Sequence, residues 1–431
     1  MTTEAPASPV PTWFGQPAGL TILFLTEMWE KFSYYGMRTL LIYYMVKQLM
    51  IGQAHASLIY GLYTAFVYFT PILGGVISDR WLGRRRAIII GGSIMAAGHF
   101  LMASEPLFYV ALATIALGNG LYLTNLPSQI GSLYADDDPR KNSAYSVYYV
   151  GVNLGALLAP ILCGTVGELY GWHYGFGLAG IGMLTGLLIY VFGAGYLPPE
   201  APRAEKKERI EAPPTRWRVL LLLLGVAIAV AILRGAYEQI GNTIALWADG
   251  QVDRRLTAGI TIPMTWFQAL NPLLIFAITP FLIRRWTRQA SEGREPSSVR
   301  KMGVGAAGIA AAYLLLAAAT WITSLHGAQT SWLWLSLFLA VLTAAELWVL
   351  PIGVGLFAKL APAHMSATII AAWFLATFAG NLLAGVLGTL WSSLAPATFF
   401  VAMAGVAGIA AMALALLNGP VSRAEASVSQ G

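Results

Sequence analysis

The sequence predicts an all-α membrane protein with twelve transmembrane helices in two six-helix bundles. Three observations support this prediction: 57% of the 431 residues are hydrophobic, only 11% are charged, and long apolar runs recur along the whole chain. A soluble domain carries roughly 25% charged residues, whereas an apolar run of about 20 residues can cross a bilayer as a helix. The runs lack the alternation expected of strands in a membrane barrel and are too long for them.

Each apolar run predicts one membrane-spanning helix. We expect these helices near residues 19–47, 57–78, 87–104, 107–134, 143–168, 174–196, 217–248, 257–283, 302–324, 331–358, 364–391 and 394–418. A charged, proline-rich segment between the sixth and seventh runs indicates a solvated linker. The expected domains are therefore a short disordered tail at 1–18, a bundle at 19–196, a cytoplasmic linker at 197–216, a bundle at 217–418 and a tail at 419–431.

Lys and Arg residues concentrate in the loops on one side of this arrangement. These loops and the C-terminal tail hold 20 of the 26 basic residues, whereas the opposite loops hold Lys47, Arg254 and Arg255. Because basic loops stay on the cytoplasmic side, both termini are expected to be cytoplasmic. The pI near 9.3 then reflects topology and does not indicate nucleic-acid binding. No organelle-targeting motif occurs, so we expect a bacterial inner membrane, with Cys163 as a lone thiol that excludes an intramolecular disulfide.

The first expected helix carries an unusual set of charges. Glu27, Glu30, Lys31 and Arg38 fall with Tyr34 within an arc of about 100° on one helix face. An ionisable residue at the bilayer centre costs about 2.5–3.5 kcal/mol, so this face must meet partners or a water-filled cavity. Burial favours the protonated carboxyl and a nearby cation favours the ionised one. The face is expected to handle protons or substrate, and a purely structural cluster of ion pairs is the alternative.

The loop after the second expected helix has a recognisable spacing. Gly75 is followed by Asp79, Gly83 and then three arginines at 84–86. This pattern resembles the loop signature of the major facilitator superfamily. The resemblance implies the fold of that superfamily, in which the binding site lies between two six-helix bundles.

A second resemblance is more specific. The run Glu27-x-x-Glu30-Lys31-Phe32-x-Tyr34-Tyr35-Gly36 resembles the first-helix motif of the proton-dependent oligopeptide transporter family, which usually has Arg in place of Lys31. Residues 145–157 resemble the fifth-helix signature of this family. Further matches are Gly118-Asn119-Gly120, Glu238-Gln239, Asn271-Pro272, Glu346 and Ala372-Trp373-Phe374-Leu375.

This resemblance implies a symporter that imports di- and tripeptides with protons by alternating access. It implies that Glu27 and Glu30 exchange protons and that Lys31 couples them to the substrate. Protons are the coupling ion, and no other cofactor is expected. The resemblance further implies a gate between Arg38 and Glu238, and substrate contacts from Tyr34, Tyr35, Tyr68, Asn153, Asn271, Glu346 at the peptide amino terminus, and Trp373.

Two positions depart from the family pattern. Leu123 stands where the family usually has a lysine in the fourth helix, and Arg234 lies one turn before Glu238 in the seventh. Arg234 can pair with Glu238 along its own helix or contact the substrate directly, and both interpretations stay open. The departures favour, as an alternative function, a proton-coupled carrier of another small anionic or zwitterionic solute.

The expected partners are small peptides, protons and the lipid bilayer, with no nucleic acid, and we expect a monomer. A membrane sensor that does not transport is the alternative from a different class. The chain has neither an His-Glu-x-x-His motif nor a Gly-x-Ser-x-Gly motif, so no enzyme and no metal site are expected.

Overall fold

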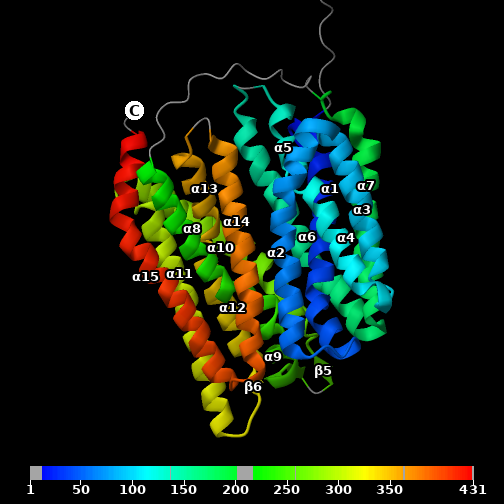
Figure 1. Ribbon diagram of the computed structural model, residues 1–431, viewed down its shortest axis with the longest axis vertical. Helices are drawn as coiled ribbons and strands as arrows, with labels where there is room; N and C mark the ends of the chain where they lie inside the picture. The colour runs from blue at the N-terminus through cyan, green and yellow to red at the C-terminus, as the bar shows by residue number, and fades with distance from the viewer. Residues whose placement is uncertain (1–11, 136, 201–216, 258, 363–364, 430–431) are drawn as a thin grey trace, which may run out of the picture.

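The computed structural model describes residues 12–135, 137–200, 217–257, 259–362 and 365–429. Over these residues the protein consists almost entirely of helices that run side by side along the long axis of the molecule (Figure 1). The helices of the first half are α1 (Ala18–Tyr43), α2 (Gln53–Ile77), α3 (Arg84–Leu101), α4 (Phe108–Tyr122), α5 (Asn125–Ser128), α6 (Arg140–Tyr170) and α7 (Trp172–Phe192). Those of the second half are α8 (Trp217–Tyr237), α9 (Thr243–Gln251), α10 (Trp266–Ser291), α11 (Ser298–Leu325), α12 (Trp332–Glu346), α13 (Leu350–Leu360), α14 (Ser366–Thr389) and α15 (Pro396–Ser429).

Short helical turns and strands complete the described chain. The turns are η1 (Tyr44–Gln48), η2 (Ser78–Leu82), η3 (Glu105–Leu107), η4 (Gly131–Leu133), η5 (Gly193–Tyr196), η6 (Glu238–Gly241) and η8 (Leu390–Ser392). The strands form three two-stranded pairs: antiparallel β1 (Thr12–Trp13) with β2 (Gln16–Pro17), parallel β3 (Val252–Asp253) with β6 (Thr330–Ser331), and antiparallel β4 (Arg255–Thr257) with β5 (Ile260–Thr261).

Ten helical segments in the described residues are long and apolar enough to cross a membrane. Helices α1 and α3 are not among them because charged or arginine-rich stretches lower their hydropathy. Both nevertheless lie within the helical array, where α1 packs on α6 and α7, and α3 packs on α4. The arrangement confirms an all-helical membrane fold and is consistent with the twelve predicted helices.

The two halves of the chain meet along a few helices. Helix α2 packs against α14, and α6 packs against α10. At the α2–α14 contact, a Cβ added to Gly61 would lie 2.4 Å from the Cα of Gly385, so the two backbones touch. Small residues permit such close approach between membrane helices. These contacts bring Arg38 and Glu238, from opposite halves, to a common interface.

Three predicted helices are interrupted. The fourth breaks at Leu123–Thr124 between α4 and α5, the seventh at 238–242 between α8 and α9, and the tenth at 347–349 between α12 and α13. Glu238 begins the turn η6, and Glu346 is the last residue of α12. Two of the three breaks therefore coincide with predicted site residues, as is common where membrane helices line a binding site.

Three predicted boundaries were wrong. Residues 12–17 form the β1–β2 hairpin instead of a disordered tail, with the ring of Trp13 5.0 Å from that of Tyr196. The eighth helix begins at Trp266, and the β4–β5 hairpin precedes it. Helix α15 continues through the predicted tail to Ser429, because its last turns pack on α11, where Ser298 donates to Glu425 at 2.5 Å. Residues 1–11 and most of the predicted linker, 201–216, lie outside the described residues.

Candidate functional site

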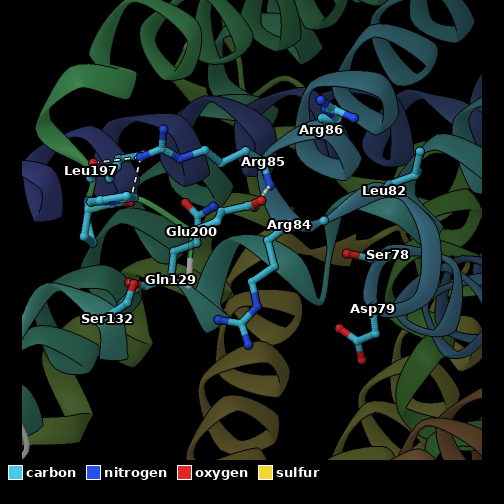
Figure 2. A pocket seen from close by; sticks show the side chains of 13 residues that line it. Ser78, Asp79, Leu82, Arg84, Arg85, Arg86, Gln129, Ser132, Leu197 and Glu200 are labelled. Atoms are coloured by element: carbon cyan, nitrogen blue, oxygen red, sulfur yellow. Dashed lines mark hydrogen bonds between the residues drawn. The ribbon is translucent and has the colours of Figure 1, made fainter. Parts of the chain in front are cut away.

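A cavity of about 860 Å³ opens beside the loop between α2 and α3, and residues 197–200 at the end of the first half of the chain line it (Figure 2). Hydrogen bonds hold the start of the predicted linker against this loop. The Arg85 backbone N–H donates to Glu200 Oε1 at 2.5 Å, and its guanidinium donates to the carbonyls of Leu197 and Pro198, both at 2.7 Å. Gly83, at φ 78°, makes the turn that brings the Glu200 carboxylate over the start of α3. The loop thus has a structural partner at the start of the predicted linker.

The charged face of α1 is buried inside the first half. Lys31 Nζ lies 3.3 Å from Glu27 Oε1 and 2.7 Å from Glu30 Oε2. Glu27 is 3% exposed and Glu30 is 0% exposed. The burial is possible because Gly155 of α6 lets that helix touch α1, where an added Cβ would lie 2.1 Å from the Met28 carbonyl oxygen. Two carboxylates therefore share one ammonium group, so the binding of one proton would make the cluster neutral.

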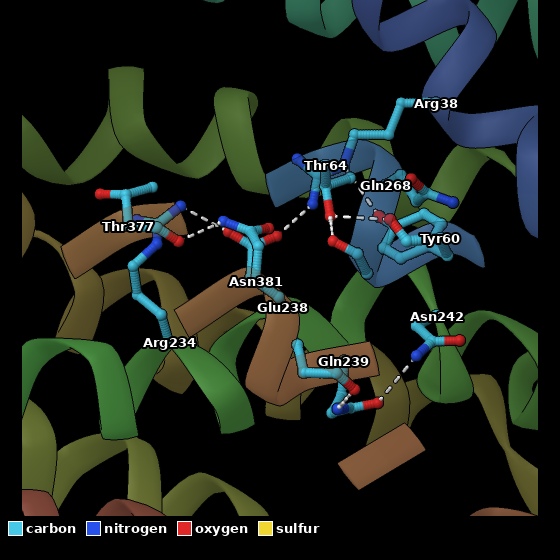
Figure 3. A network of polar contacts seen from close by, with 12 residues as sticks. Arg38, Tyr60, Thr64, Arg234, Glu238, Gln239, Asn242, Gln268, Thr377 and Asn381 are labelled. Atoms are coloured by element: carbon cyan, nitrogen blue, oxygen red, sulfur yellow. Dashed lines mark hydrogen bonds and ion pairs between the residues drawn. The ribbon is translucent and has the colours of Figure 1, made fainter. Parts of the chain in front are cut away.

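A second ionic cluster joins the two halves, as Figure 3 shows. The Glu238 carboxylate accepts from Arg38 of α1 on one oxygen and from Arg234 of α8 on the other, the latter at 2.5 Å. Arg38 also donates from Nε to the Tyr60 hydroxyl at 2.8 Å. This cluster has an excess of positive charge, because two guanidinium groups share one carboxylate, whereas the cluster around Lys31 has an excess of negative charge.

Arg234 has donor capacity left over. It is 6% exposed, and its guanidinium carbon lies 5.6 Å from the Tyr68 ring centroid and 6.0 Å from that of Tyr237. Among the described residues its Nε has no hydrogen-bond acceptor. Gly380 makes room for it, since an added Cβ there would lie 2.6 Å from the Arg234 Cβ. Arg234 can therefore pair with Glu238 along α8 and still donate to another anion.

Glu346, on α12, lines a small pocket together with Arg234 and Tyr237 of α8. It accepts from Asn271 Nδ2 at 2.7 Å, and the same amide donates to Thr343 Oγ1 at 3.1 Å. Tyr237 also interacts electrostatically with Glu346. No Lys or Arg in the described part of the chain lies within ion-pair distance of this carboxylate. Glu346 is thus a buried acid held by neutral donors.

Other predicted substrate residues are less clearly arranged around the clusters. Tyr34 and Tyr35 pack edge to face at 5.2 Å on α1. The Asn153 side chain donates to the Tyr149 carbonyl of its own helix at 3.0 Å. Trp373 packs on Phe357 at 5.2 Å, filling the space left by a glycine of α13. Asn153 and Trp373 therefore have local partners here, and their substrate contacts stay predictions.

Three polar neighbours were not predicted: Tyr60, Tyr237 and Thr343. A signal for the first was present, because Tyr60, Thr64 and Tyr68 follow at intervals of four and share one face of α2. Tyr237 directly precedes Glu238, but the direction in which its hydroxyl points could not be predicted from sequence alone. Tyr60 contacts Arg38, Tyr237 lies beside Arg234, and Thr343 shares Asn271 with Glu346, so these side chains surround the cluster that joins the halves.

Further contacts between the halves lie at the end of the molecule opposite the cavity (Figure 1). Lys47 pairs with Asp249 at 2.6 Å. The Glu168 carboxylate of α6 accepts from the Thr265 backbone N–H at 3.0 Å and from the Thr265 hydroxyl at 2.7 Å, just before α10. The halves are therefore bound to each other at this end.

A helical membrane fold of two halves, with one buried ionic cluster inside the first half and another that joins the halves, is typical of secondary transporters. Comparison with known proteins supports this class, because the family model described as POT family matches residues 85–208 and 200–401. The chain is 31% identical to the Peptide transporter YePEPT of Yersinia enterocolitica subsp. palearctica serotype O:3 (strain YE-P4), over 88% of each chain. It is 32% identical to the Di-/tripeptide transporter of Lactococcus lactis subsp. cremoris, over 92% of this chain and 94% of the relative.

A solved structure agrees as well. The crystal structure of a peptide transporter POT in complex with sulfate superposes with a TM-score of 0.87 at 28% identity, over 96% of this chain and 97% of that chain. The protein belongs to the POT family, the proton-dependent oligopeptide transporters. This confirms the family predicted from the motifs, and with it a transporter of the major facilitator fold instead of an enzyme.

Proposed function

We propose that the protein imports di- and tripeptides together with protons by alternating access. The observation that supports this most is the pair of opposite charge imbalances: two carboxylates on Lys31, and two guanidinium groups on Glu238. The first is suited to hold a proton and the second to attract an anion. The names of the relatives from Yersinia and Lactococcus point to the same substrates.

Proton and substrate binding are coupled through Lys31. A substrate carboxylate that pairs with Lys31 weakens its contacts with Glu27 and Glu30, which lie 3.3 and 2.7 Å away. With less cationic charge nearby, the two carboxylates take up a proton more readily. Peptide and proton are then carried together. A buried structural cluster provides no such link, because its ion pairs stay closed.

The substrate is held at both ends. Glu346, which has neutral donors and no cation within ion-pair distance among the described residues, receives the peptide ammonium group. The peptide carboxylate goes to Arg234 or Lys31, because Leu123 offers no charge where the family usually has lysine. A guanidinium group can bind a carboxylate through two donors. Tyr34, Tyr35, Tyr68, Asn153, Asn271 and Trp373 complete the proposed pocket.

The transport cycle is gated at the end opposite the linker. Arg38 and Glu238 link α1 to η6, and Lys47–Asp249 and Glu168–Thr265 add contacts toward the same end. With the linker in the cytoplasm, as the distribution of basic residues favours, these contacts close the periplasmic side. The proposed setting is a bacterial inner membrane with both termini cytoplasmic, and the proposed state is monomeric. A proton-coupled carrier of another small anionic or zwitterionic solute is the second candidate, favoured by the additional guanidinium of Arg234.

The experiment that tests the substrate assignment uses competition by end-blocked dipeptides in proteoliposomes. In the wild type, N-acetylation and C-terminal amidation should each weaken competition strongly. Arg234→Ala is expected to weaken free dipeptides by roughly 10- to 100-fold, the loss of a charge-assisted pair of about 1.5–3 kcal/mol, while C-terminal amides change little. Glu346→Gln is the matched control, because it should remove the sensitivity to N-acetylation only. Equal weakening of free peptides and amides by Arg234→Ala would show that Arg234 only pairs with Glu238.

A further inference from the structure

Glu30 has no direct access to solvent. It is fully buried, and Gly186 of α7 packs on α1 at this point, where an added Cβ would lie 3.1 Å from the Thr26 carbonyl oxygen and 3.7 Å from the Glu30 nitrogen. Tyr190 lies one turn after Gly186 on α7. A few residues later, Gly193 packs against Ile22 of α1, so the two helices stay in contact along this stretch. A proton that leaves Glu30 toward the end of the molecule holding the cavity therefore passes between α1 and α7.

Two buried hydroxyl groups lie near Glu30 and the contact between α1 and α7. Thr26, on α1, and Tyr122, on α4, are both at most 1% exposed, and neither hydroxyl has a hydrogen-bond partner among the described residues. Tyr122 interacts electrostatically with Glu27, Glu30 and Tyr190. Its ring also lies beside α3, since a Cβ added to Gly92 would lie 3.6 Å from it, and Leu187 and Met183 of α7 lie against the same glycine. Buried hydroxyls of this kind normally bind ordered water.

The passage ends at the cavity beside the linker. The Tyr190 hydroxyl accepts from Gln129 Nε2 at 2.8 Å and lies 3.1 Å from Gln129 Oε1, to which it donates. Gln129 itself lines the cavity of about 860 Å³, together with Arg85 and Glu200 (Figure 2). Arg84, Arg86 and Glu200 of the same wall are exposed, so the cavity communicates with solvent.

We propose that protons pass between the Glu27–Glu30 pair and the cytoplasm through the interior of the first bundle, along Thr26, Tyr122 and Tyr190 to Gln129 and the cavity. This inference rests on the proposed proton coupling. At each hydroxyl the oxygen receives a proton from the preceding oxygen or bound water and gives its own proton to the next. Gln129 carries no proton itself: its amide holds the Tyr190 hydroxyl in place, and water in the cavity takes the last proton. No group on the route changes its net protonation.

The route separates proton movement from peptide movement. The peptide site lies between the bundles near Arg234 and Glu346, whereas Tyr122 on α4, Tyr190 on α7 and Gln129 in the turn between α5 and η4 all belong to the first bundle. Tyr148 of α6 interacts electrostatically with Glu27, and Arg85 and Glu200 are the charged groups at the exit. Lys31 is the one cation beside the two carboxylates at the entrance, among the residues whose positions the structure gives.

The test uses the full chain in proteoliposomes with two readouts: peptide-dependent proton entry, reported by a trapped pH dye, and counterflow of a labelled dipeptide without a pH gradient. Tyr122→Phe and Gln129→Leu should each slow proton entry by about tenfold, less than the roughly 10²–10⁴-fold effect of a positioned proton-transfer group because water replaces part of the route. Counterflow should stay close to wild type. Tyr44→Phe, which removes another buried hydroxyl without a partner in the described chain, is the matched control and should alter neither readout.

The outcomes distinguish this inference from the function on which it rests. Wild-type proton coupling together with unchanged proton entry in both variants would refute the route and leave the proposed function standing. An equal loss of proton entry and counterflow would assign Tyr122 and Gln129 a structural role and also overturn the route. Absence of peptide-dependent proton entry in the wild type would remove the proposed coupling itself.

Discussion

Glu30→Gln is expected to abolish peptide accumulation driven by a pH gradient while peptide counterflow largely persists. Glu30 is fully buried and its carboxylate lies 2.7 Å from Lys31 Nζ, so glutamine keeps the shape but cannot bind or release the coupling proton. Counterflow exchanges one peptide for another and needs no net proton movement. The measurement is the initial rate of labelled dipeptide uptake into proteoliposomes, with and without an imposed pH gradient.

Glu27→Gln should behave in the same way, because Glu27 shares the same ammonium group at 3.3 Å. The matched control is Glu292→Gln, which removes an exposed carboxylate paired with Arg288 and should leave uptake unchanged. Normal accumulation by Glu30→Gln against a peptide gradient would exclude Glu30 from the coupling site and leave Glu27 as the sole candidate on this face.

The second large effect is expected at the gate, and it should be asymmetric. Glu238→Ala leaves Arg38 and Arg234 as two neighbouring buried cations without their carboxylate. The breaking of a buried ion pair in this way costs roughly 3–5 kcal/mol, less where water enters. Arg38→Ala should cost less, because Glu238 keeps its pair with Arg234 at 2.5 Å. Counterflow rate and apparent Tm in detergent report the two losses.

A double-mutant cycle checks this account. The combined Arg38→Ala and Glu238→Ala variant should lose less than the sum of the single losses, since the residues interact directly. An exchange of the two residues should restore little, because Arg234 would then face a guanidinium group. Simple additivity of the two losses would mean that the contact between α1 and η6 does not hold the gate closed.

Much of this site was readable from sequence because charges in an apolar helix are costly and therefore informative. The shared face of Glu27, Glu30 and Lys31 follows from helical spacing within a single segment. The juxtaposition of Arg38 and Glu238, 200 residues apart, could not follow from spacing and was predicted through family resemblance. The structure adds that Arg234 pairs with the same carboxylate, one of the two interpretations left open.

Other features depended on tertiary packing and could not be predicted. The break between α12 and α13 lies in an apolar stretch without a glycine, and only Pro351 shortly after it hints at an interruption. The continuation of α15 through Pro420 depends on its packing against α11, where Val421 is fully buried. The tyrosines of the proposed proton route lie on separate helices, α4 and α7, so no periodicity along the chain connects them.

The central claim is that the protein couples peptide import to protons, and one measurement tests it most directly. Purified wild-type protein in liposomes is supplied with labelled di- and tripeptides, amino acids or nitrate, outside acidic and inside neutral. The account predicts accumulation of di- and tripeptides above the outside concentration, lost when a protonophore removes the gradient, and no accumulation of amino acids or nitrate. Accumulation of another solute in place of peptides, or peptide uptake that is indifferent to the protonophore, would contradict it.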